Sequence, residues 1–400
     1  MVRNVVITGI GVVSSIGVGV NEFWTALIRG TSGISDVDSF DTSSFQCHRG
    51  GEVKEQAWRD LVSRKEAKFG MASQFAIAGT RLALKDAKYN LLRQPVSVCF
   101  GTTMGEIQLL EQADSEWVRL GEEGISRTLV WQYPASNIAT NVSRTFKCKG
   151  PRFLLPTACA AGNYAIGYAT DLIRLGRTDM AIAGGVDVFS KIAFTGFNRL
   201  FSMAPDSCQP FDLNRKGLIL AEGAGVLILE TAESAERRGV RPYAEISGYG
   251  LSCDGSHMTR SSVEGIETVI RRALRDAHVD ISEVDYISAH GTGTEANDRA
   301  ECAAIQRVFL NKSQQIPTSS IKSMLGHTMG AASAIEAASC ALAIRKHLIP
   351  PTMNFTTKDP ECDINCFPNK ALEGDVSVAI NNSFAFGGNN ACVVLRKYEC

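Results

Sequence analysis

Short apolar runs rich in β-branched residues recur along the chain and end in glycine or another small residue. Runs that polar residues do not interrupt are typical of strands buried on both faces of a sheet. Longer segments between them carry alanine and leucine at helical spacing. This alternation predicts an α/β protein in which helices cover a buried sheet. The expected strands are Val5–Thr8, Val96–Gly101, Phe153–Pro156, Met180–Gly184, Val226–Glu230, Tyr286–Ala289 and Val376–Ile380, and the expected helices span 71–87, 160–175, 262–277, 297–309 and 331–346.

The chain divides into two unequal halves. With 400 residues it is longer than one small core needs, so we expect one large domain or two fused ones. The first half, residues 1–239, closes at Arg237–Gly239 after an expected strand. The second half, residues 240–400, opens at Tyr243 with a new strand. No proline- or serine-rich linker separates them, so the halves are expected to pack as one unit. Internal self-similarity is too weak to establish a duplication.

Charge and cysteine usage argue against several classes of function. The chain has 41 lysine and arginine residues against 42 aspartate and glutamate residues, so no net field attracts nucleic acid or an anionic membrane. The longest apolar stretches are too short to span a bilayer. The 12 cysteines are scattered, and the nearest pair, Cys362 and Cys366, has no second pair at zinc spacing. We therefore expect reduced thiols, no metal site and a cytoplasmic protein.

The first candidate for chemistry is Cys159, in the segment TACAAG. An expected strand runs into Pro156 and Thr157, and a helix begins near the cysteine, which places the thiol on a sharp strand-to-helix elbow. The positive end of the helix dipole favours a thiolate there. Small neighbours leave space around the sulfur. The alternative is a buried cysteine that only packs as a small apolar residue.

The second candidate is His290, in the segment AHGTGT. The loop that follows a strand is where α/β proteins place their ligands. Gly291 and Gly293 allow close backbone approach, and Thr292 and Thr294 offer hydroxyl groups to a polar ligand. The alternative is a surface turn with an incidental histidine.

The third candidate lies in the segment KSMLGH, where Lys322 and His327 flank a glycine turn. An alanine-rich helix follows and carries Glu336. We expect Lys322 and His327 to be buried, and buried ionisable groups need partners, for which Glu336 is the obvious choice. The alternative is a charged loop ahead of an alanine-rich helix.

The fourth candidate is the segment NNSFAFGGNN, residues 381–390, in which Phe384 and Phe386 alternate with Ala385 ahead of two glycines. A glycine-rich turn that carries an aromatic residue can gate a site or donate N–H groups to an oxyanion. The alternative is a hairpin turn with two core phenylalanines.

The four segments together place one cysteine, two histidines, a lysine and a glutamate on loops at strand ends. One cysteine and one histidine would suit a protease or an acyltransferase. A second histidine indicates a further step, because two neutral imidazoles can donate hydrogen bonds to the enolate oxygen that forms when a β-keto acid loses CO2.

In this order, the four segments resemble those of the β-ketoacyl-acyl-carrier-protein synthases. The N-terminal VVITGIGVVSSIG, the block Pro210–Glu230 and the segment Ser247–Thr259 fit the same family, so the resemblance covers nearly the whole chain. It implies the thiolase fold, a duplicated five-layer α-β-α-β-α core. It also implies a decarboxylative Claisen condensation without a metal or organic cofactor. The phosphopantetheine arm arrives on the acyl carrier protein, which is the implied partner.

The same resemblance implies a role for each candidate residue. Cys159 corresponds to the acyl-accepting nucleophile, and His290 and His327 to the two decarboxylation histidines. Lys322 corresponds to the lysine that sets the electrostatics around the second histidine. The other implied roles belong to Glu336 as a buried structural carboxylate, Phe386 as the gate whose N–H joins that of Cys159 in the oxyanion hole, Thr292, Thr294 and Phe384 as substrate-binding residues, and Arg64, Lys65 and Lys68 as the carrier-protein contacts.

The segments HGTGTEANDRAE and TTKDPECDINCFPN look closer to the ketosynthase subunits of type II polyketide systems than to fatty-acid enzymes. Those subunits usually pair with a chain-length factor, a homologue without the cysteine. We therefore expect a heterodimer in which this chain is the catalytic partner. The alternatives are a homodimeric fatty-acid ketosynthase, a ketosynthase-like acyltransferase, a non-catalytic scaffold subunit and a hydrolytic Cys–His enzyme. Ala385 stands where the gate loop often has glycine, and is expected to restrict its motion.

Overall fold

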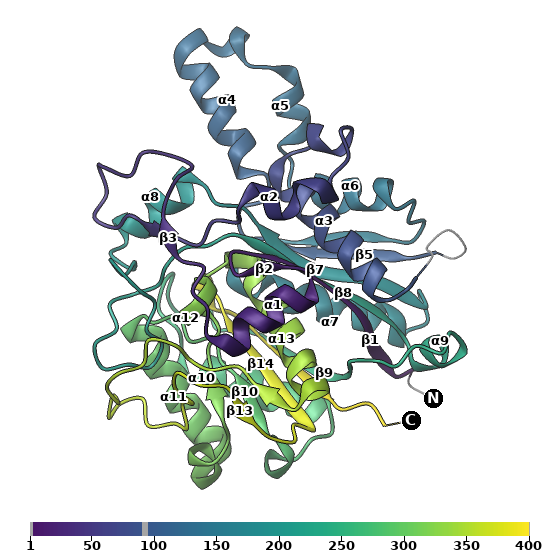
Figure 1. Cartoon of the computed structure of the whole chain (residues 1–400), viewed down its shortest axis with the longest axis vertical. Coiled ribbons are helices and arrows are strands. Elements are labelled where there is room, and N and C mark those ends of the chain that lie inside the picture. Colours follow the sequence, from purple (N-terminus) through teal and green to yellow (C-terminus); the bar gives the residue numbers. More distant parts are fainter. Residues whose placement is uncertain (1–2, 90–94, 400) are drawn as a thin grey trace.

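One mixed β-sheet runs through the molecule and joins its two halves (Figure 1). The computed structural model describes residues 3–89 and 95–399. Across the sheet, the strand order is β11-β10-β14-β15-β9-β1-β8-β7-β5-β6, and β2 pairs with β1. The strands of the first half are β1 (Val5–Ser14), β2 (Gly17–Val18), β5 (Ser97–Gly101), β6 (Arg152–Leu155), β7 (Met180–Asp187) and β8 (Gly223–Thr231). Those of the second half are β9 (Ala244–Cys253), β10 (Tyr286–Ser288), β11 (Thr318–Ser319), β14 (Val378–Phe384) and β15 (Asn389–Arg396).

The two halves repeat one topology. When the five main strands of each half are numbered in chain order, both halves read 3-2-4-5-1 across the sheet. In both, the second strand lies parallel to the third and fourth, and the remaining pairs are antiparallel. The innermost strands β1 and β9 then pair with each other. A duplication that the sequence could not establish is therefore visible in the strand order.

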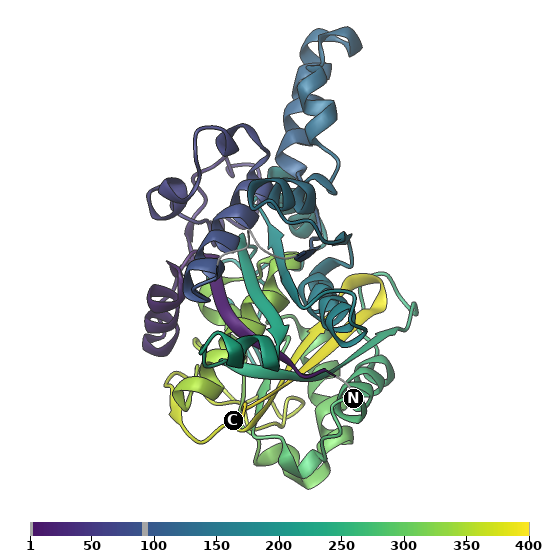
Figure 2. The same cartoon turned by 90° about the vertical axis from the view of Figure 1, so that its right-hand side faces the viewer.

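Helices form three layers around the two halves of the sheet (Figure 2). The central layer holds α7 (Ala161–Arg174) and α13 (Ala332–Lys346), each of which contacts strands of both halves. On the outer faces, α3 (Met71–Asp86) packs on β1 and β8, and α10 (Val263–Asp276) packs on β9 and β15, next to α11 (Glu295–Phe309). These layers confirm the expected α-β-α-β-α arrangement.

Two further pairs of short strands and several peripheral helices complete the described chain. The strand pairs are β3 (Ser35–Asp36) with β4 (Arg49–Gly50), and β12 (Leu348–Ile349) with β13 (Leu372–Glu373). The remaining helices are α1 (Val20–Arg29), α2 (Glu55–Trp58), α4 (Ile107–Leu120), α5 (Arg127–Gln132), α6 (Asn137–Thr145), α8 (Lys191–Arg199), α9 (Ala232–Arg237) and α12 (Lys322–Leu325). Within residues 3–89 and 95–399, no helix is long and apolar enough to cross a membrane.

The central helix α13 is buried on every side from Ala332 to Ile344, which explains why its sequence is rich in alanine rather than amphipathic. Small residues let it approach the sheet closely. A Cβ atom added to Gly225 of β8 would lie 2.5 Å from the backbone nitrogen of Ile335. Only glycine therefore allows α13 to lie directly on β8 at this point.

The α4–α5 segment is an arm that projects from the body of the molecule (Figures 1 and 2). It carries large apolar side chains that are exposed, among them Val118 (84% exposed) and Trp131 (80% exposed). Trp117, Leu120, Val130 and Tyr133 are exposed on the same arm. An apolar surface of this kind is typical of a protein–protein contact.

Replacing Gly225 by alanine is expected to lower the free energy of unfolding by about 1–3 kcal/mol, because the new methyl group would displace the backbone of α13. Gly196→Ala is the matched control. Gly196 lies in α8 with nothing within 4 Å of an added Cβ, so alanine there should raise stability by about 1 kcal/mol. Denaturant unfolding measures both variants. A Gly225→Ala chain as stable as the wild type would contradict direct packing of α13 on β8.

Candidate active site

Cys159 lies on an elbow between β6 and α7. It occupies a single 3-10 turn, η5 (Ala158–Ala160), directly ahead of α7, and is 7% exposed. Ala158 has a φ angle of 50°, in the left-handed region that a residue with a Cβ rarely adopts, at a cost of roughly 1–3 kcal/mol. The hydroxyl of Ser383 on β14 donates to the carbonyl oxygen of Cys159 at 2.9 Å. The sheet of the second half therefore holds the elbow of the first.

The expected thiolate at Cys159 is not what the structure indicates. Burial raises the pKa of the Cys159 thiol to about 12, and the nearby positive charge of Lys322 opposes this only in part. The thiol does lie at the N-terminal end of α7, as the sequence predicts. Desolvation of the charged form outweighs that advantage. The resting residue is therefore a neutral thiol, which must give up its proton as it reacts.

His290 and His327 face each other in the interior. Each is only 2% exposed, and their ring centroids lie 5.5 Å apart with the planes at 83°. His290 follows β10, and His327 follows α12. The ring of Phe384 lies edge-on to His290 at 5.8 Å between centroids. The burial expected of His327 is confirmed, and His290, for which a surface turn was the alternative, is buried beside it next to the ring of Phe384.

Hydrogen bonds fix the tautomer of both imidazoles. The backbone N–H of Met329 donates to Nδ1 of His327 at 3.1 Å, so this nitrogen carries no proton. Nδ1 of His290 lies 3.4 Å from Nζ of Lys322, which can only donate. Burial, together with the charge of Lys322, lowers the pKa of both histidines well below the usual value. Both rings are therefore neutral, with the proton on Nε2 available as a donor.

Lys322 lies at the centre of the polar network. Its ammonium donates to the carbonyl oxygen of His290 at 2.7 Å and forms a buried ion pair with Glu336 of α13. Burial raises the pKa of Glu336, and the adjacent ammonium opposes the rise. The sequence associated Lys322 with His327. The structure instead places the ammonium against His290, because α12 turns the side chain toward the end of β10, and its influence on His327 acts through space.

Three buried carboxylates hold the site loops, and the sequence analysis did not single them out. Glu301 of α11 accepts hydrogen bonds from the backbone N–H groups of His290 and Gly291, both at 2.8 Å. Asp298, one turn earlier, accepts from the N–H of Thr292 at 3.1 Å. In the first half, Asp187 accepts from three backbone N–H groups, those of Thr103 at 2.7 Å, Met104 at 2.9 Å and Gly330 at 2.6 Å. The pair at positions 298 and 301 had a signal in the sequence, since acidic residues three apart open a helix directly after AHGTGT.

The hairpin between β14 and β15 presents two different phenylalanines. Phe384 is buried, as expected of a core residue, whereas Phe386 is 38% exposed. The ring centroids of Phe386 and Phe197 lie 6.1 Å apart. The N–H of Phe386 has no acceptor among the described residues, whereas those of Ala385 and Gly388 do. Ala385 has φ −109°, an extended conformation, so alanine causes no strain at this position in this structure.

Thr292 and Thr294 lie on the side of the site that leads to solvent. Their hydroxyl oxygens are 2.8 Å apart. Thr292 is buried, and Thr294 lines a pocket of about 420 Å³ together with Phe386, Thr259 and Lys216. The pocket therefore brings the Thr294 hydroxyl and the ring of Phe386 to one opening of the protein surface.

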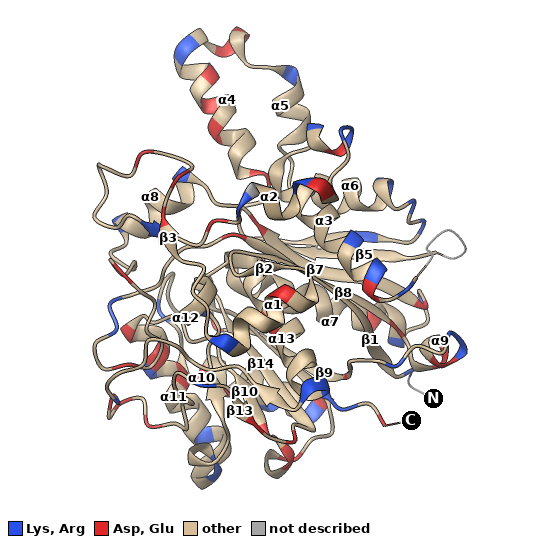
Figure 3. Ribbon diagram, in the orientation of Figure 1, with Lys and Arg blue, Asp and Glu red and all other residues tan. Residues whose placement is uncertain are grey.

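Arg64, Lys65 and Lys68 are exposed and form no ion pair within the described chain. The segment is a loop and one 3-10 turn, η2 (Glu66–Lys68), rather than a long helix. The side chain of Gln132 on α5 donates to the carbonyl oxygen of Lys68 at 3.0 Å. Figure 3 shows basic and acidic residues interspersed along the ribbon of the whole molecule.

The fold brings the sequence motifs together. The elbow η5 contacts the turn η8 (Met329–Ala331), which follows His327, and also contacts β14 and β15 of the gate hairpin. The structure thus assembles a neutral thiol, two Nε2–H donors and a free N–H at Phe386. Within the described chain, no group of three histidine, cysteine, aspartate or glutamate side chains could hold a metal ion.

Comparison with known proteins identifies the same family in both halves of the chain. The family described as beta-ketoacyl synthase, N-terminal domain, matches residues 2–235, and its C-terminal domain matches residues 243–356. Nodulation protein E of Rhizobium sp. (strain N33) is 37% identical, over 99% of this chain and 100% of that protein. The 3-oxoacyl-[acyl-carrier-protein] synthase 2 of Staphylococcus aureus (strain COL) is 36% identical, over 99% of each chain.

Two solved structures share the fold over its whole length. The ishigamide ketosynthase/chain length factor is 42% identical with a TM-score of 0.96, and AntDE:AntF, a type II PKS acyl-carrier protein in complex with its ketosynthase, is 32% identical with a TM-score of 0.92. Both matches cover 100% of both chains. The fold and site thus define an acyltransferase that forms carbon–carbon bonds. The chain belongs to the β-ketoacyl synthase family, and its activity is that of a β-ketoacyl-acyl-carrier-protein synthase.

Removal of the Glu301 carboxylate is expected to destabilise the His290 loop. Glu301→Ala leaves two buried N–H groups without an acceptor, which costs about 1–3 kcal/mol for each group. Glu301→Gln keeps one acceptor oxygen and should cost less. Glu295→Ala is the control, because Glu295 is exposed on the same helix. Denaturant unfolding measures all three. Equal stability of Glu301→Ala and Glu295→Ala would contradict the positioning role.

Proposed function

We propose that this chain is the catalytic ketosynthase subunit of a type II polyketide system. The observation that carries the proposal is the 42% identity and 0.96 TM-score to the ishigamide ketosynthase/chain length factor over the full length of both chains. Cys159, His290 and His327 together support a catalytic rather than a scaffold subunit. A fatty-acid elongating enzyme is the second candidate, because the synthase 2 relatives match over 99% of the chain.

The first half-reaction loads Cys159. Its sulfur attacks the acyl thioester of the carrier protein, and the negative charge that develops on the carbonyl oxygen is stabilised by the N–H groups of Cys159 and Phe386. The bond from the acyl carbon to the carrier sulfur then breaks. The proton of the Cys159 thiol ends on the released carrier thiol, so the exchange is balanced without a permanent thiolate. The N-terminus of α7 stabilises the charge that appears on sulfur in passing.

The second half-reaction uses the two imidazoles. Malonyl-carrier protein enters, the bond between its carboxylate and α-carbon breaks, and CO2 leaves. The electron pair forms an enolate, whose oxygen accepts hydrogen bonds from Nε2–H of His290 and of His327. The enolate carbon attacks the acyl group on Cys159, the carbon–sulfur bond breaks, and the cysteine recovers a proton from solvent. Neutral rings suit this task because they donate a proton in a hydrogen bond without transferring it.

The substrate arm would enter past Phe386. Thr294 lines the pocket beside Phe386, and the hydroxyl of Thr292 lies next to that of Thr294. Both would offer hydroxyls to the phosphopantetheine arm of the carrier. Catalysis needs no metal or organic cofactor in this scheme, since the reacting groups come from the chain and from the two substrates. Arg64, Lys65 and Lys68 would contact the acidic carrier protein, with which their charge is complementary.

The assembly we propose is a heterodimer with a homologue that lacks the cysteine. Strand β6 is an edge strand of the described sheet, and it leads directly into the Cys159 elbow. The α4–α5 arm exposes Trp117, Val118 and Trp131 to solvent. Open strand edges and apolar surfaces of this size favour a partner subunit. A homodimer is the alternative.

The half-reactions should separate by mutation. Cys159→Ala should abolish the covalent acyl adduct with the fold intact, and Cys159→Gln should decarboxylate malonyl-carrier protein without condensation.

His290→Ala and His327→Ala should still become acylated but should each lose decarboxylation by about 10²–10³-fold, because each removes one donor to the enolate. Mass spectrometry of the adduct and CO2 release measure the two steps. An acyl adduct on Cys159→Ala, or decarboxylation at the wild-type rate in a histidine variant, would contradict the assigned role.

Charge reversal at Lys65 and Lys68 should raise the apparent KM for carrier-bound substrate and leave a small pantetheine substrate unaffected. Higher salt should raise the KM of the wild type in the same way, because it screens the attraction. The matched control is Arg275→Glu/Lys370→Glu, which reverses two charges that are exposed elsewhere. Equal losses with both substrates would indicate misfolding or a different docking surface.

Assembly separates the polyketide and fatty-acid candidates. We expect the chain to be soluble and active with a co-expressed cysteine-less homologue, and Trp131→Glu to release monomers that light scattering detects. Leu310→Glu, at another exposed apolar residue, is the control. Enlarging partner residues that face the acyl tunnel should change product length. A soluble, active homodimer of this chain alone would refute the heterodimer and favour the fatty-acid candidate.

A further inference from the structure

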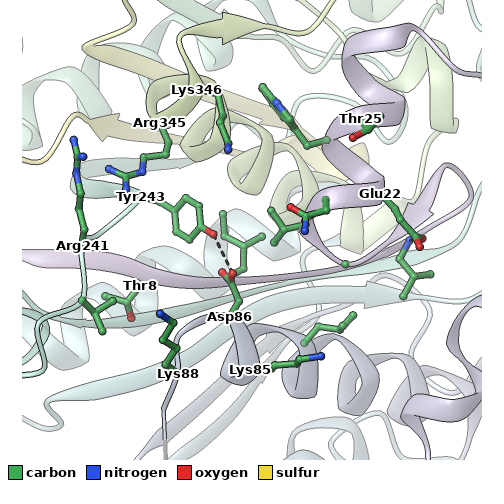
Figure 4. Close-up of a pocket in the computed structure, with 18 of the residues that line it drawn as sticks. Thr8, Glu22, Thr25, Lys85, Asp86, Lys88, Arg241, Tyr243, Arg345 and Lys346 are labelled. Atoms are coloured by element: carbon green, nitrogen blue, oxygen red, sulfur yellow. Dashed lines mark hydrogen bonds between the residues drawn. The ribbon is translucent and has the colours of Figure 1, made fainter.

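A large cleft lies apart from the residues of the active site (Figure 4). Its volume is about 1500 Å³. The walls come from the start of α1, the end of α3, the connection between the two halves and the end of α13. None of the candidate catalytic or carrier-binding residues lines it. Its lining includes six basic residues and four others, namely Lys85, Lys88, Arg238, Arg241, Arg345 and Lys346, with Glu22, Trp24, Asp86 and Tyr243.

Six basic and two acidic residues line this cleft, so positive charge predominates in it. Among the six basic residues, Arg238 forms an ion pair, with Glu230 at 2.7 Å. The other five form no ion pair with any residue in the described parts of the chain. Four of them, Lys85, Lys88, Arg241 and Lys346, are exposed. Figure 4 shows the basic side chains placed around Tyr243 and Asp86.

Neither of the two acidic residues of the cleft forms an ion pair with these cations within the described residues. Asp86 accepts hydrogen bonds from the backbone N–H of Ile10 at 2.9 Å and the hydroxyl of Tyr243 at 3.1 Å. Glu22 accepts from the backbone N–H of Val18 at 3.2 Å, on its own side of the cleft. Both carboxylates are thus engaged with the walls, and the cations face open space.

The helix dipole accounts for part of this arrangement of basic residues. Lys85, Arg345 and Lys346 lie in the last turns of α3 and α13, where the helix dipole favours a cation. That effect does not explain why two helix ends and the residues Lys88 and Arg241 converge on one concave space. A cleft in which one sign of charge predominates concentrates the field and attracts counter-ions of the opposite sign.

We propose that this cleft binds a small molecule that carries two or more phosphate groups. Phosphate oxygens match the donors of arginine and lysine, and several cations around one cavity suit several anionic groups. The volume exceeds what pyrophosphate needs, and Trp24 and Tyr243 offer aromatic surface to an organic part such as a nucleoside. The inference is independent of the proposed polyketide role.

Isothermal titration calorimetry with pyrophosphate and with ADP tests the proposal. Coenzyme A is avoided because its arm could enter the catalytic site. We expect both probes to bind the wild type, with weaker binding at higher salt. Lys88→Ala/Arg241→Ala should weaken binding at least about tenfold, since two charged donors are lost. The control Arg275→Ala/Lys370→Ala removes the same charge from exposed positions outside the cleft and should change the affinity less than about twofold.

The outcomes of the titrations distinguish a nucleotide, inorganic polyphosphate and an acidic protein surface as the ligand of the cleft. Tighter binding of ADP than of pyrophosphate would support a nucleotide-like ligand, and equal binding would support inorganic polyphosphate. Equal weakening by both double variants would place binding outside the cleft and overturn the proposal. Absence of binding of either probe to the wild type would also overturn it, as would binding of polyglutamate alone, which would indicate an acidic protein surface instead.

Discussion

The buried ammonium of Lys322 is the interaction on which the site depends. It joins α12, the His290 loop after β10 and Glu336 of α13. Burying a charge is costly unless a partner and hydrogen bonds compensate it. Burial lowers the pKa of both histidines, and the charge of Lys322 lowers it further, because a second cation in the same buried pocket would be unfavourable. The same side chain therefore ties three segments of the site together and adds to the effect of burial that keeps both imidazoles neutral.

The duplicated topology explains how two halves build one site. In each half a three-residue 3-10 turn follows the third strand and precedes a central helix. These are η5 and α7 in the first half and η8 and α13 in the second, where the short helix α12 lies between the strand and the turn. Each turn begins with a residue at φ 50°, Ala158 or Met329. The turns touch each other. One copy carries the cysteine, and the other follows His327, so symmetry of the fold places different chemical groups face to face.

Much of this could be predicted from the sequence. The expected strands and central helices are present within a few residues, because buried apolar runs and alanine-rich helices have clear periodicities. The four motifs identified Cys159, His290, His327 and Lys322 as neighbours. The sequence did not reveal that Lys322 contacts His290 rather than His327. It also did not reveal that the Cys159 thiol is neutral, or that Asp187 and Glu301 accept hydrogen bonds from the site loops. These depend on burial and on backbone N–H groups from distant segments, which no local pattern records.

The central claim is that two neutral imidazoles present Nε2–H donors to the enolate. Nitrogen-15 NMR of the histidine rings tests it most directly. At pH 6.5 the account predicts that His290 and His327 are neutral with the proton on Nε2, and that Lys322→Met raises the pKa of both, since the ammonium that lowers them is removed. Protonated rings at that pH, or a proton on Nδ1 of His327, would contradict the account.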